Sequence, residues 1–427
     1  MLPVVLVLLL CFGLVMDNGQ ASTIPGSPAY GEEVGTSALA LAMFCVLLAS
    51  YVLMSGDRYL FPVLAVDVRR DFGFSLANTG LLSTIFTLGL GIGGLPTGYV
   101  LSKFSRKSVL LSGIAIFSGA TALTTISTGF WSMLVCLAAT GIGMAMLATS
   151  MFALAAGYFV HYRAAAIGSV NFCYGIGGFI GPILAGFLLV SYGTWRAPMV
   201  VFGLFGFLMI GVIAVTVHPW FSETRRTSKV RADTGGAPTL LNRNTVLLTA
   251  LSMIQGVSMY GFLGMYPTFL RENLHYSPKA AGVVMSFYGL GALASIAGGW
   301  VGDRFSPRLV LGGAFLCLAE LGYLFFQRSE GIITREILTC IYGVLGSAIL
   351  YVNLAGYHVK AVRSGLAGRG SGMFVTSLYG AAAFSGYLIG VIASRWGWVI
   401  AGEIQMSLLC VVGAALALGL RPSQMSL

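Results

Sequence analysis

A short basic loop that occurs twice constrains the fold of this chain more than any other feature of its sequence. The first copy, at 98–107, reads Gly-Tyr-Val-Leu-Ser-Lys-Phe-Ser-Arg-Lys, and the second, at 299–308, reads Gly-Trp-Val-Gly-Asp-Arg-Phe-Ser-Pro-Arg. The copies begin 201 residues apart, close to half of the 427 residues, and each lies between two long apolar runs. Such a repeat predicts two related halves, a construction found among membrane transporters.

Twelve apolar runs, each about long enough to cross a bilayer as a helix, follow one another along the chain. The composition agrees, because 57% of the residues are hydrophobic and 9% are charged, whereas about a quarter are charged in soluble domains. The runs are 38–66, 76–101, 108–128, 131–159, 165–191, 197–217, 245–270, 280–301, 309–326, 332–357, 370–393 and 399–420. The sequence therefore predicts an all-α membrane protein with twelve transmembrane helices in two six-helix halves.

These runs also divide the chain into segments. We expect six-helix halves at 38–217 and 245–420, a basic linker at 218–244 and a short tail at 421–427. Residues 1–37 begin with an apolar run of about 16 residues, which is short for a span. We therefore expect a mobile extension there rather than a thirteenth helix, and leave open whether it belongs to the mature protein.

The distribution of Lys and Arg predicts the orientation. Fifteen of them lie in segments on the side of the linker, eight lie on the opposite side, and Arg58 alone lies inside a span. Because basic residues collect in cytoplasmic segments, the linker and both termini are predicted to be cytoplasmic, in a multi-pass protein of the cell's inner membrane.

An acidic and a basic residue, Asp57 and Arg58, lie deep inside the first apolar run. A charge at such depth costs at least about 2.5–3.5 kcal/mol, so it usually faces a cavity and marks a substrate or proton path. Neighbours on a helix point about 100° apart, so the two side chains serve different contacts. We predict that Arg58 binds an anionic group and that Asp57 carries a proton. The alternative is a structural ion pair with polar groups on neighbouring helices.

Six polar residues on the inner helices are further candidates for a substrate or proton site: Asn171, Tyr174, Gln255, Tyr260, Asn353 and Tyr379. Each of them alternatively joins two helices by a hydrogen bond. The four histidines do not have the spacing of a zinc site, and the seven cysteines lie in apolar runs as packing residues. We therefore predict no metal site.

The repeated loop resembles the signature loop of the major facilitator superfamily, Gly-x-x-x-Asp-Arg/Lys-x-Gly-Arg/Lys-Arg/Lys. The matching positions, which the resemblance implies are gating residues, are Gly98, Ser102, Lys103, Arg106, Lys107, Gly299, Asp303, Arg304 and Arg308. The first copy departs from the pattern, because Ser102 replaces the acid. The resemblance implies a twelve-helix fold whose halves rock around a midplane site. It also implies that the acid of the loop caps a facing helix across the two halves.

Two further stretches resemble particular branches of this superfamily. Residues 50–107 resemble Spinster-type lipid transporters, but Leu137 and Met144 stand where those proteins carry an arginine and a glutamate. The fifth apolar run contains Gly177, Gly181, Pro182 and Gly186, a pattern similar to the motif associated with antiport. Close helix packing explains the same glycines equally well. Leu137 also replaces the fourth-span arginine of proton-linked drug exporters, so the direction of transport stays open.

We therefore predict a secondary active transporter that moves a small organic solute, an organic anion coupled to protons, by rocker-switch alternating access. The alternatives are a lysolipid or hydrophobic drug transporter of the same fold, and a transport-dead relative that acts as a sensor. A phosphate-binding loop and a paired nucleophile and base are missing from the sequence. We therefore expect neither an enzyme nor a cofactor, and a proton or ion gradient as energy source. The expected partners are the solute and the bilayer, without nucleic acid, and we expect a monomer.

Overall fold

A computed structural model describes residues 38–159, 162–223, 236–326 and 331–425. The predicted N-terminal extension and the middle of the predicted linker lie outside these residues. The described residues form helices joined by short loops, with one isolated β-bridge and no strand.

The first half contains six spans. Their helices are α2 (Ala38–Asp57) with α3 (Leu60–Phe72), α4 (Leu76–Thr84) with α5 (Phe86–Lys103), α6 (Arg106–Leu123), α7 (Phe130–Tyr158), α8 (Arg163–Tyr192) and α9 (Arg196–Thr216). Ser75 and Ser105 cap α4 and α6, because their hydroxyl groups accept hydrogen bonds from the backbone N–H groups three residues later. The short α10 (Pro219–Ser222) follows α9.

The second half repeats this arrangement. Its helices are α11 (Arg243–Glu272), α12 (Pro278–Ala292) with α13 (Ser295–Arg304), α14 (Pro307–Phe325), α15 (Ile332–Gly343) with the π-helix η2 (Val344–Tyr351) and α16 (Val352–Lys360), α17 (Ala367–Ala382) with α18 (Ser385–Trp396), and α19 (Trp398–Gly402) with the π-helix η4 (Glu403–Leu408) and α20 (Leu409–Leu418). Eleven spans in the described residues are long and apolar enough to cross a membrane, and α12 with α13, bent by 44°, makes the twelfth when counted as one. The predicted all-α membrane fold is confirmed.

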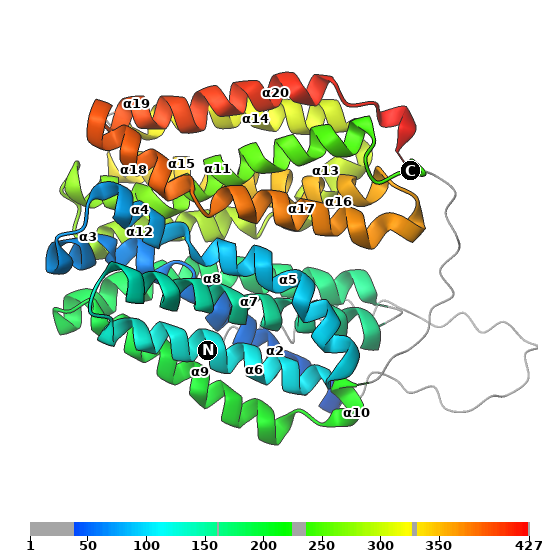
Figure 1. Ribbon diagram of the computed structural model, residues 1–427, viewed down its shortest axis with the longest axis horizontal. Coiled ribbons are helices and arrows are strands. Elements are labelled where there is room, and N and C mark those ends of the chain that lie inside the picture. Colours follow the sequence, from blue (N-terminus) through cyan, green and yellow to red (C-terminus); the bar gives the residue numbers. More distant parts are fainter. Residues whose placement is uncertain (1–37, 160–161, 224–235, 327–330, 426–427) are drawn as a thin grey trace, which may run out of the picture.

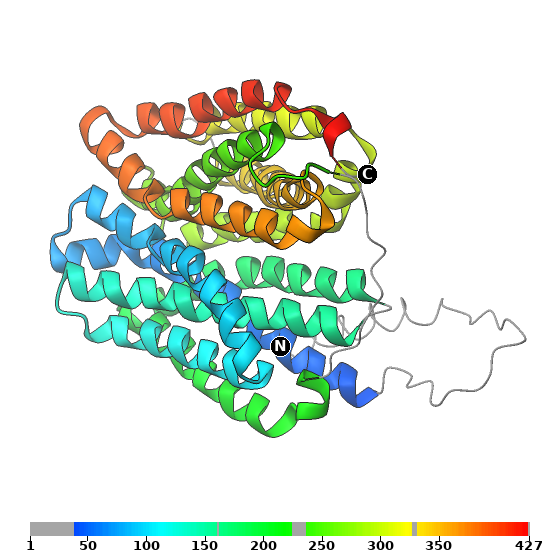
Figure 2. The same ribbon diagram turned by 45° about the vertical axis from the view of Figure 1, so that its right-hand side comes forward.

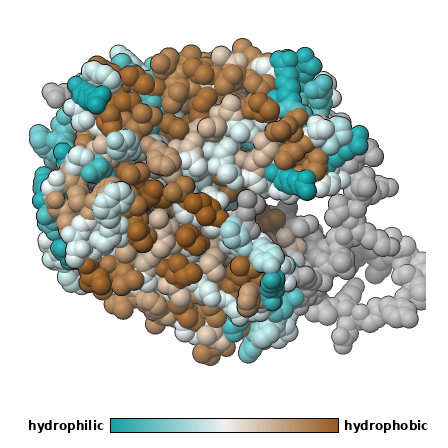
Figure 3. Space-filling model, viewed as in Figure 1, coloured by the Kyte–Doolittle hydropathy of each residue, from teal (hydrophilic) through white to brown (hydrophobic). Residues whose placement is uncertain are grey.

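The two halves lie one above the other in Figure 1, the first in blue to green and the second in green to red. Both repeated loops, the start of α11 and the C-terminal residues lie at one end of the molecule, at the right of Figures 1 and 2. We call this the linker end, and the opposite end, where α3 ends, the far end. Figure 3 shows hydrophobic residues across the middle of the surface and hydrophilic residues gathered at these two ends, as expected for a protein that crosses a bilayer.

Two helix crossings form the most extensive contacts between the halves. In one, α8 packs against α12, and in the other, α4 packs against α18. At the second crossing the backbones of Gly80 and Gly386 lie so close that a Cβ atom on either would overlap the carbonyl group of the other. The hydroxyl of Thr84 donates to the carbonyl oxygen of Ala383 at 2.8 Å and accepts from the N–H of Gly386 at 3.3 Å. It thereby satisfies backbone groups that the break between α17 and α18 sets free.

Candidate functional site

The first span is interrupted at Arg58 and Tyr59, between α2 and α3. Pro62 explains the interruption, because it has no N–H to donate to the carbonyl group of Arg58 one turn earlier. The N–H of Tyr59 instead donates to the carbonyl oxygen of Gly56 at 3.1 Å. Broken helices are typical of the substrate sites of transporters, where the freed backbone groups line a cavity.

Helix α8 packs closely on α2 just before this interruption. Gly177 and Gly181 lie against the backbone of Gly56, where a Cβ atom would clash. The hydroxyl of Ser55 donates to the backbone carbonyl oxygen of Tyr174 at 2.6 Å. The predicted packing residues of the fifth span therefore hold Tyr174 beside the broken part of the first span. Farther along the same helix, Pro182 and Gly186 contact α12 of the other half.

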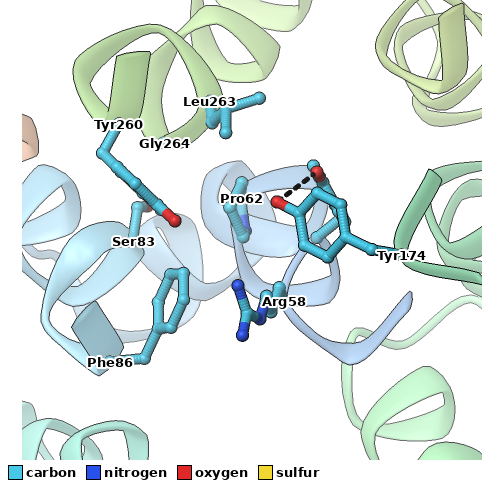
Figure 4. A pocket seen from close by; sticks show the side chains of 9 residues that line it. Arg58, Pro62, Ser83, Phe86, Tyr174, Tyr260, Leu263 and Gly264 are labelled. Carbon is cyan, nitrogen blue, oxygen red and sulfur yellow. Dashed lines mark hydrogen bonds between the residues drawn. The ribbon is translucent and has the colours of Figure 1, made fainter. Parts of the chain in front are cut away.

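One cavity lies between the halves, and we call it the central cavity (Figure 4). It is lined by Arg58, Tyr59, Pro62, Ser83, Phe86, Tyr174, Tyr260, Leu263 and Gly264, so it draws on both halves. In Figure 4 the guanidinium group of Arg58 points into the space between Phe86 and Tyr174, and the hydroxyl of Tyr260 enters from α11. The hydroxyls of Tyr59 and Tyr174 are hydrogen-bonded at 3.2 Å.

Arg58 is the cation of this cavity, and only 8% of it is exposed. Its guanidinium carbon lies 5.3 Å from the centre of the Tyr174 ring, a cation–π contact. Its Nε atom is buried without a hydrogen-bond partner. Within the described residues Arg58 forms no ion pair with a carboxylate. A buried charge without a partner is costly, so this arrangement is suited to an anionic ligand.

Asp57 faces a different space, the second cavity, inside the first half. The hydroxyl of Thr121 on α6 lies 3.1 and 3.0 Å from its two carboxylate oxygens, to which it donates. The cavity is lined by Asp57, Arg58, Phe61, Leu82, Phe86, Thr121, Leu137, Thr140, Met144 and Met199. Leu137 and Met144, the two departures from the Spinster pattern, thus lie beside Asp57. Arg58 borders both cavities, whereas Asp57 borders only the second.

The other predicted site residues divide into two groups. Tyr260 and Tyr379 are neighbours, with ring centroids 5.9 Å apart, and the hydroxyl of Tyr379 bonds that of Tyr351 at 3.0 Å. Gln255 and Asn353 join helices instead. The amide of Gln255 donates to the carbonyl oxygen of Gly346 in η2 at 2.9 Å. The amide of Asn353 donates to the carbonyl oxygen of Gly298 in α13 at 2.9 Å.

Asn171, the remaining candidate, is half-buried on α8 one turn before Tyr174. It lies outside the linings of both cavities.

The repeated loops lie at the linker end, where each copy places a cation over an aromatic ring. Lys103 lies 4.5 Å from the centre of the Tyr99 ring, and Arg304 lies 5.5 Å from that of Trp300. The hydroxyl of Ser102 donates to the backbone carbonyl oxygen of Tyr99.

The acid of the second copy, Asp303, pairs with Lys360 at 2.8 Å within its own half. The side chain of Arg308 donates to the carbonyl oxygen of Leu420 at 2.6 Å, also within that half.

Residues of the predicted linker bind to the half next to them. The carboxylate of Glu223 accepts hydrogen bonds from the backbone N–H groups of Arg106 and Lys107 at 3.0 and 3.1 Å, so it caps α6. Ala237 exchanges backbone hydrogen bonds with Ala361 and Arg363 of the second half. The predicted linker is thus attached to the first half before residue 224 and to the second half after residue 235.

Sequence reasoning missed several residues that line the cavities. Tyr59, Ser83, Phe86 and Leu263 carry no charge and stand in apolar runs, where nothing separates a cavity wall from helix packing. Pro62 is the signal that was available, since a proline one turn after a charged pair inside a span predicts a broken helix.

Comparisons with known proteins agree with this architecture. Residues 39–386 match the family model described as Major Facilitator Superfamily. The 4-hydroxybenzoate transporter PcaK of Pseudomonas putida is 22% identical over 71% of this chain and 75% of its own length. Protein spinster homolog 1 of Xenopus laevis is 22% identical over 89% of this chain and 76% of its own.

Among solved structures, a bacterial homolog of the human lysosomal transporter Spinster, inward-facing and unoccupied, has the same fold. It superposes with a TM-score of 0.68 at 17% identity, over 90% of this chain and 96% of the other. The resemblance to Spinster-type members is thus borne out in sequence and in fold. The chain belongs to the major facilitator superfamily of membrane transporters.

Proposed function

We propose that this transporter moves a small aromatic carboxylate and that transport is coupled to protons. The carboxylate binds the guanidinium of Arg58 in the central cavity. The observation that carries the proposal is the burial of that guanidinium without a carboxylate partner in the described part of the chain. A ligand carboxylate offers two acceptor oxygens to the planar guanidinium, which is the geometry that arginine binds best.

The walls of the cavity favour an aromatic ring on the ligand. Phe86, Tyr174 and Tyr260 surround Arg58 in Figure 4. Aromatic faces pack well against a flat ring in offset or edge-to-face arrangements. The hydroxyl pair of Tyr59 and Tyr174 offers donors and acceptors to a polar group on that ring. A relative named as a 4-hydroxybenzoate transporter supports this substrate class.

Asp57 is the proposed proton carrier, with the gradient as the energy source. Its carboxyl group lies next to Arg58 in sequence but in the second cavity, so its proton does not occupy the space of the substrate. Protonation of Asp57 removes a negative charge near Arg58, and the net attraction of the site for an anionic ligand increases because the repulsion between Asp57 and the ligand is lost. Proton and anion binding would then favour one another, and rocking of the halves would carry both across. The proposed orientation places the linker end in the cytoplasm.

The test is ligand-dependent thermal stabilisation of the purified protein, because a ligand that binds only the folded state raises its melting temperature. We expect 4-hydroxybenzoate to stabilise the parent and the uncharged 4-hydroxybenzyl alcohol to have little effect. Arg58→Gln removes charge-assisted hydrogen bonds worth about 1.5–3 kcal/mol, so binding should weaken by about 10- to 150-fold. Arg70→Gln is the matched control, since Arg70 is an exposed arginine at the end of the same span. Equal stabilisation of the two variants would contradict the assignment of Arg58.

The rival substrate is a lysolipid, because residues 50–107 resemble Spinster-type lipid transporters and a Spinster homolog is among the relatives. A lysophosphatidylcholine and a hydrophobic cationic drug therefore belong in the same screen. Stabilisation by the lysolipid alone, unchanged in Arg58→Gln, would replace the aromatic acid as the proposed substrate. The coupling is tested separately with Asp57→Asn. In this variant we expect substrate binding to be retained, while uptake into proteoliposomes no longer depends on protons.

A further inference from the structure

Two ion pairs join the halves at the far end. The guanidinium of Arg69 on α3 donates to both carboxylate oxygens of Glu272 on α11, at 2.8 and 2.6 Å. Arg271 on α11 pairs with Asp67 on α3, and its Nη2 lies 3.1 Å from one carboxylate oxygen. Since α3 belongs to the first half and α11 to the second, each pair bridges residues more than 200 positions apart.

The two pairs reinforce one another through the order of their charges. Asp67 and Arg69 alternate acid and base along α3, and Arg271 and Glu272 present base and acid on α11, so each charge meets its opposite. Arg271 also donates to the backbone carbonyl oxygen of Val63 at 3.1 Å. Sliding α3 along α11 would bring like charges together, and the pairs therefore set the register of the two helices as well as their distance.

These pairs are shielded from water more than ordinary surface pairs. The side chain of Arg271 is 6% exposed and that of Asp67 25%, while Arg69 and Glu272 are 30% and 25% exposed. Exposed pairs contribute little to stability, but removing one partner of a largely buried pair is costly because it leaves a charge uncompensated.

We infer that these two ion pairs form a latch that holds the far ends of the halves together and must break each time the far end opens. The latch makes the closed far end the resting state of the protein. Another ion pair at the same end, Arg196 with Asp71, joins α9 to α3 within the first half. Its partners move together when the halves rock, so it takes no part in the latch.

The test measures the separation of the far ends without any substrate, so it stands or falls independently of the proposed function. Spin labels are placed on Thr128→Cys and Ser394→Cys, exposed far-end positions of the first and second half, after replacement of the native cysteines. Pulsed electron spin resonance in lipid nanodiscs then gives the distance distribution between the halves. Arg69→Glu and Glu272→Arg each place like charges opposite one another. We expect each to raise the ratio of long to short distances at least about tenfold.

The double variant, in which Arg69→Glu and Glu272→Arg are combined, restores opposite charges and should return the distribution to that of the parent. Asp71→Asn, the matched control, should leave it unchanged. Glu272→Gln, which creates no repulsion, replaces any reversed single variant that does not fold, and the same shift toward long distances is expected from it. The inference is overturned if the single variants keep the parent distribution, if the double variant stays open, or if Asp71→Asn opens the far end equally.

Discussion

The glycine crossing between α4 and α18 leads to a quantitative prediction about how the halves are joined. Gly386→Ala adds one methyl group where the helices touch. That carbon would lie 2.7 Å from the carbonyl carbon of Gly80 and 2.9 Å from Cγ2 of Thr84, whereas ordinary contacts begin at 3.4 Å. The helices must therefore separate for the alanine to fit. Gly380 lies on α17, the preceding helix of the same span. Gly380→Ala is the matched control, because its added methyl group would meet no atom within 4 Å.

The difference between the two variants isolates the cost of the contact. Both replace a helical glycine by alanine, which favours the folded state by about 0.5–1 kcal/mol in each case. This gain cancels in the comparison. Forcing a methyl group into a packed interface costs about 1–3 kcal/mol. Separating the surfaces by about 0.5–1 Å also removes a quarter to a half of the dispersion energy of each atomic contact between them. Gly386→Ala should thus be about 1–3 kcal/mol less stable than Gly380→Ala.

Thermal unfolding of the purified variants measures this difference. One kcal/mol corresponds to about 2–4 °C for a domain of 150–250 residues, and each half is of this size. Gly386→Ala is therefore expected to melt about 2–12 °C below Gly380→Ala. Gly80→Ala acts on the same contact from the other side, and one separation of the helices relieves both clashes. The double variant, which combines Gly80→Ala with Gly386→Ala, should consequently lose less stability than the sum of the losses in the two single variants. Equal melting temperatures for Gly386→Ala and Gly380→Ala, or strict additivity, would refute this account of the crossing.

Three further predictions concern topology, coupling and gating. Reporter fusions at Ser222 and at Leu427 should both read as cytoplasmic, because of the excess of basic residues on the linker side; an outside signal at either would contradict the twelve-span arrangement. Asp57→Asn should retain substrate exchange in proteoliposomes but lose accumulation driven by a proton gradient, and normal accumulation would remove Asp57 from the coupling step. Asp303→Asn should slow uptake far more than Ser102→Ala does, because only the second copy of the loop has an acid, and its ion pair with Lys360 is lost in this variant; equal rates would show that the difference between the copies has no mechanical effect.

The fold could be predicted from the sequence because hydrophobic length and the repeated loop are local signals. The bend between α12 and α13 lies within the predicted run 280–301, and the break after Asp57 lies within the predicted run 38–66. Because hydropathy is averaged along an apolar run, it does not reveal such interruptions. Pro62 marks the break after Asp57. The bend between α12 and α13 lies at Leu293 and Ala294, and neither of these residues is a proline or a glycine.

The candidate site was less predictable, because one residue type serves several purposes inside a membrane. Gln255 and Tyr260 lie five positions apart on α11, yet the first bonds a carbonyl group of η2 and the second borders the central cavity. The latch pairs were also hidden. Arg69 and Arg271 appear in the sequence only as basic residues near span ends, and partners more than 200 positions away follow from the packing of the halves.

We expect the rings of the repeated loop to anchor each half in the bilayer. Tyr99 and Trp300, which are 63% and 58% exposed, carry the cations Lys103 and Arg304 over their faces at the linker end. Tyrosine and tryptophan settle at the level of the lipid headgroups, and long basic side chains extend toward the same layer.

When the halves tilt against each other, both anchors stay in this layer only if the surrounding lipid deforms, at a cost that depends on membrane thickness. The rocking rate is therefore expected to vary with the acyl-chain length of the host lipids. Trp300→Leu should flatten that dependence, and an identical dependence in the variant would show that the ring does not anchor its half.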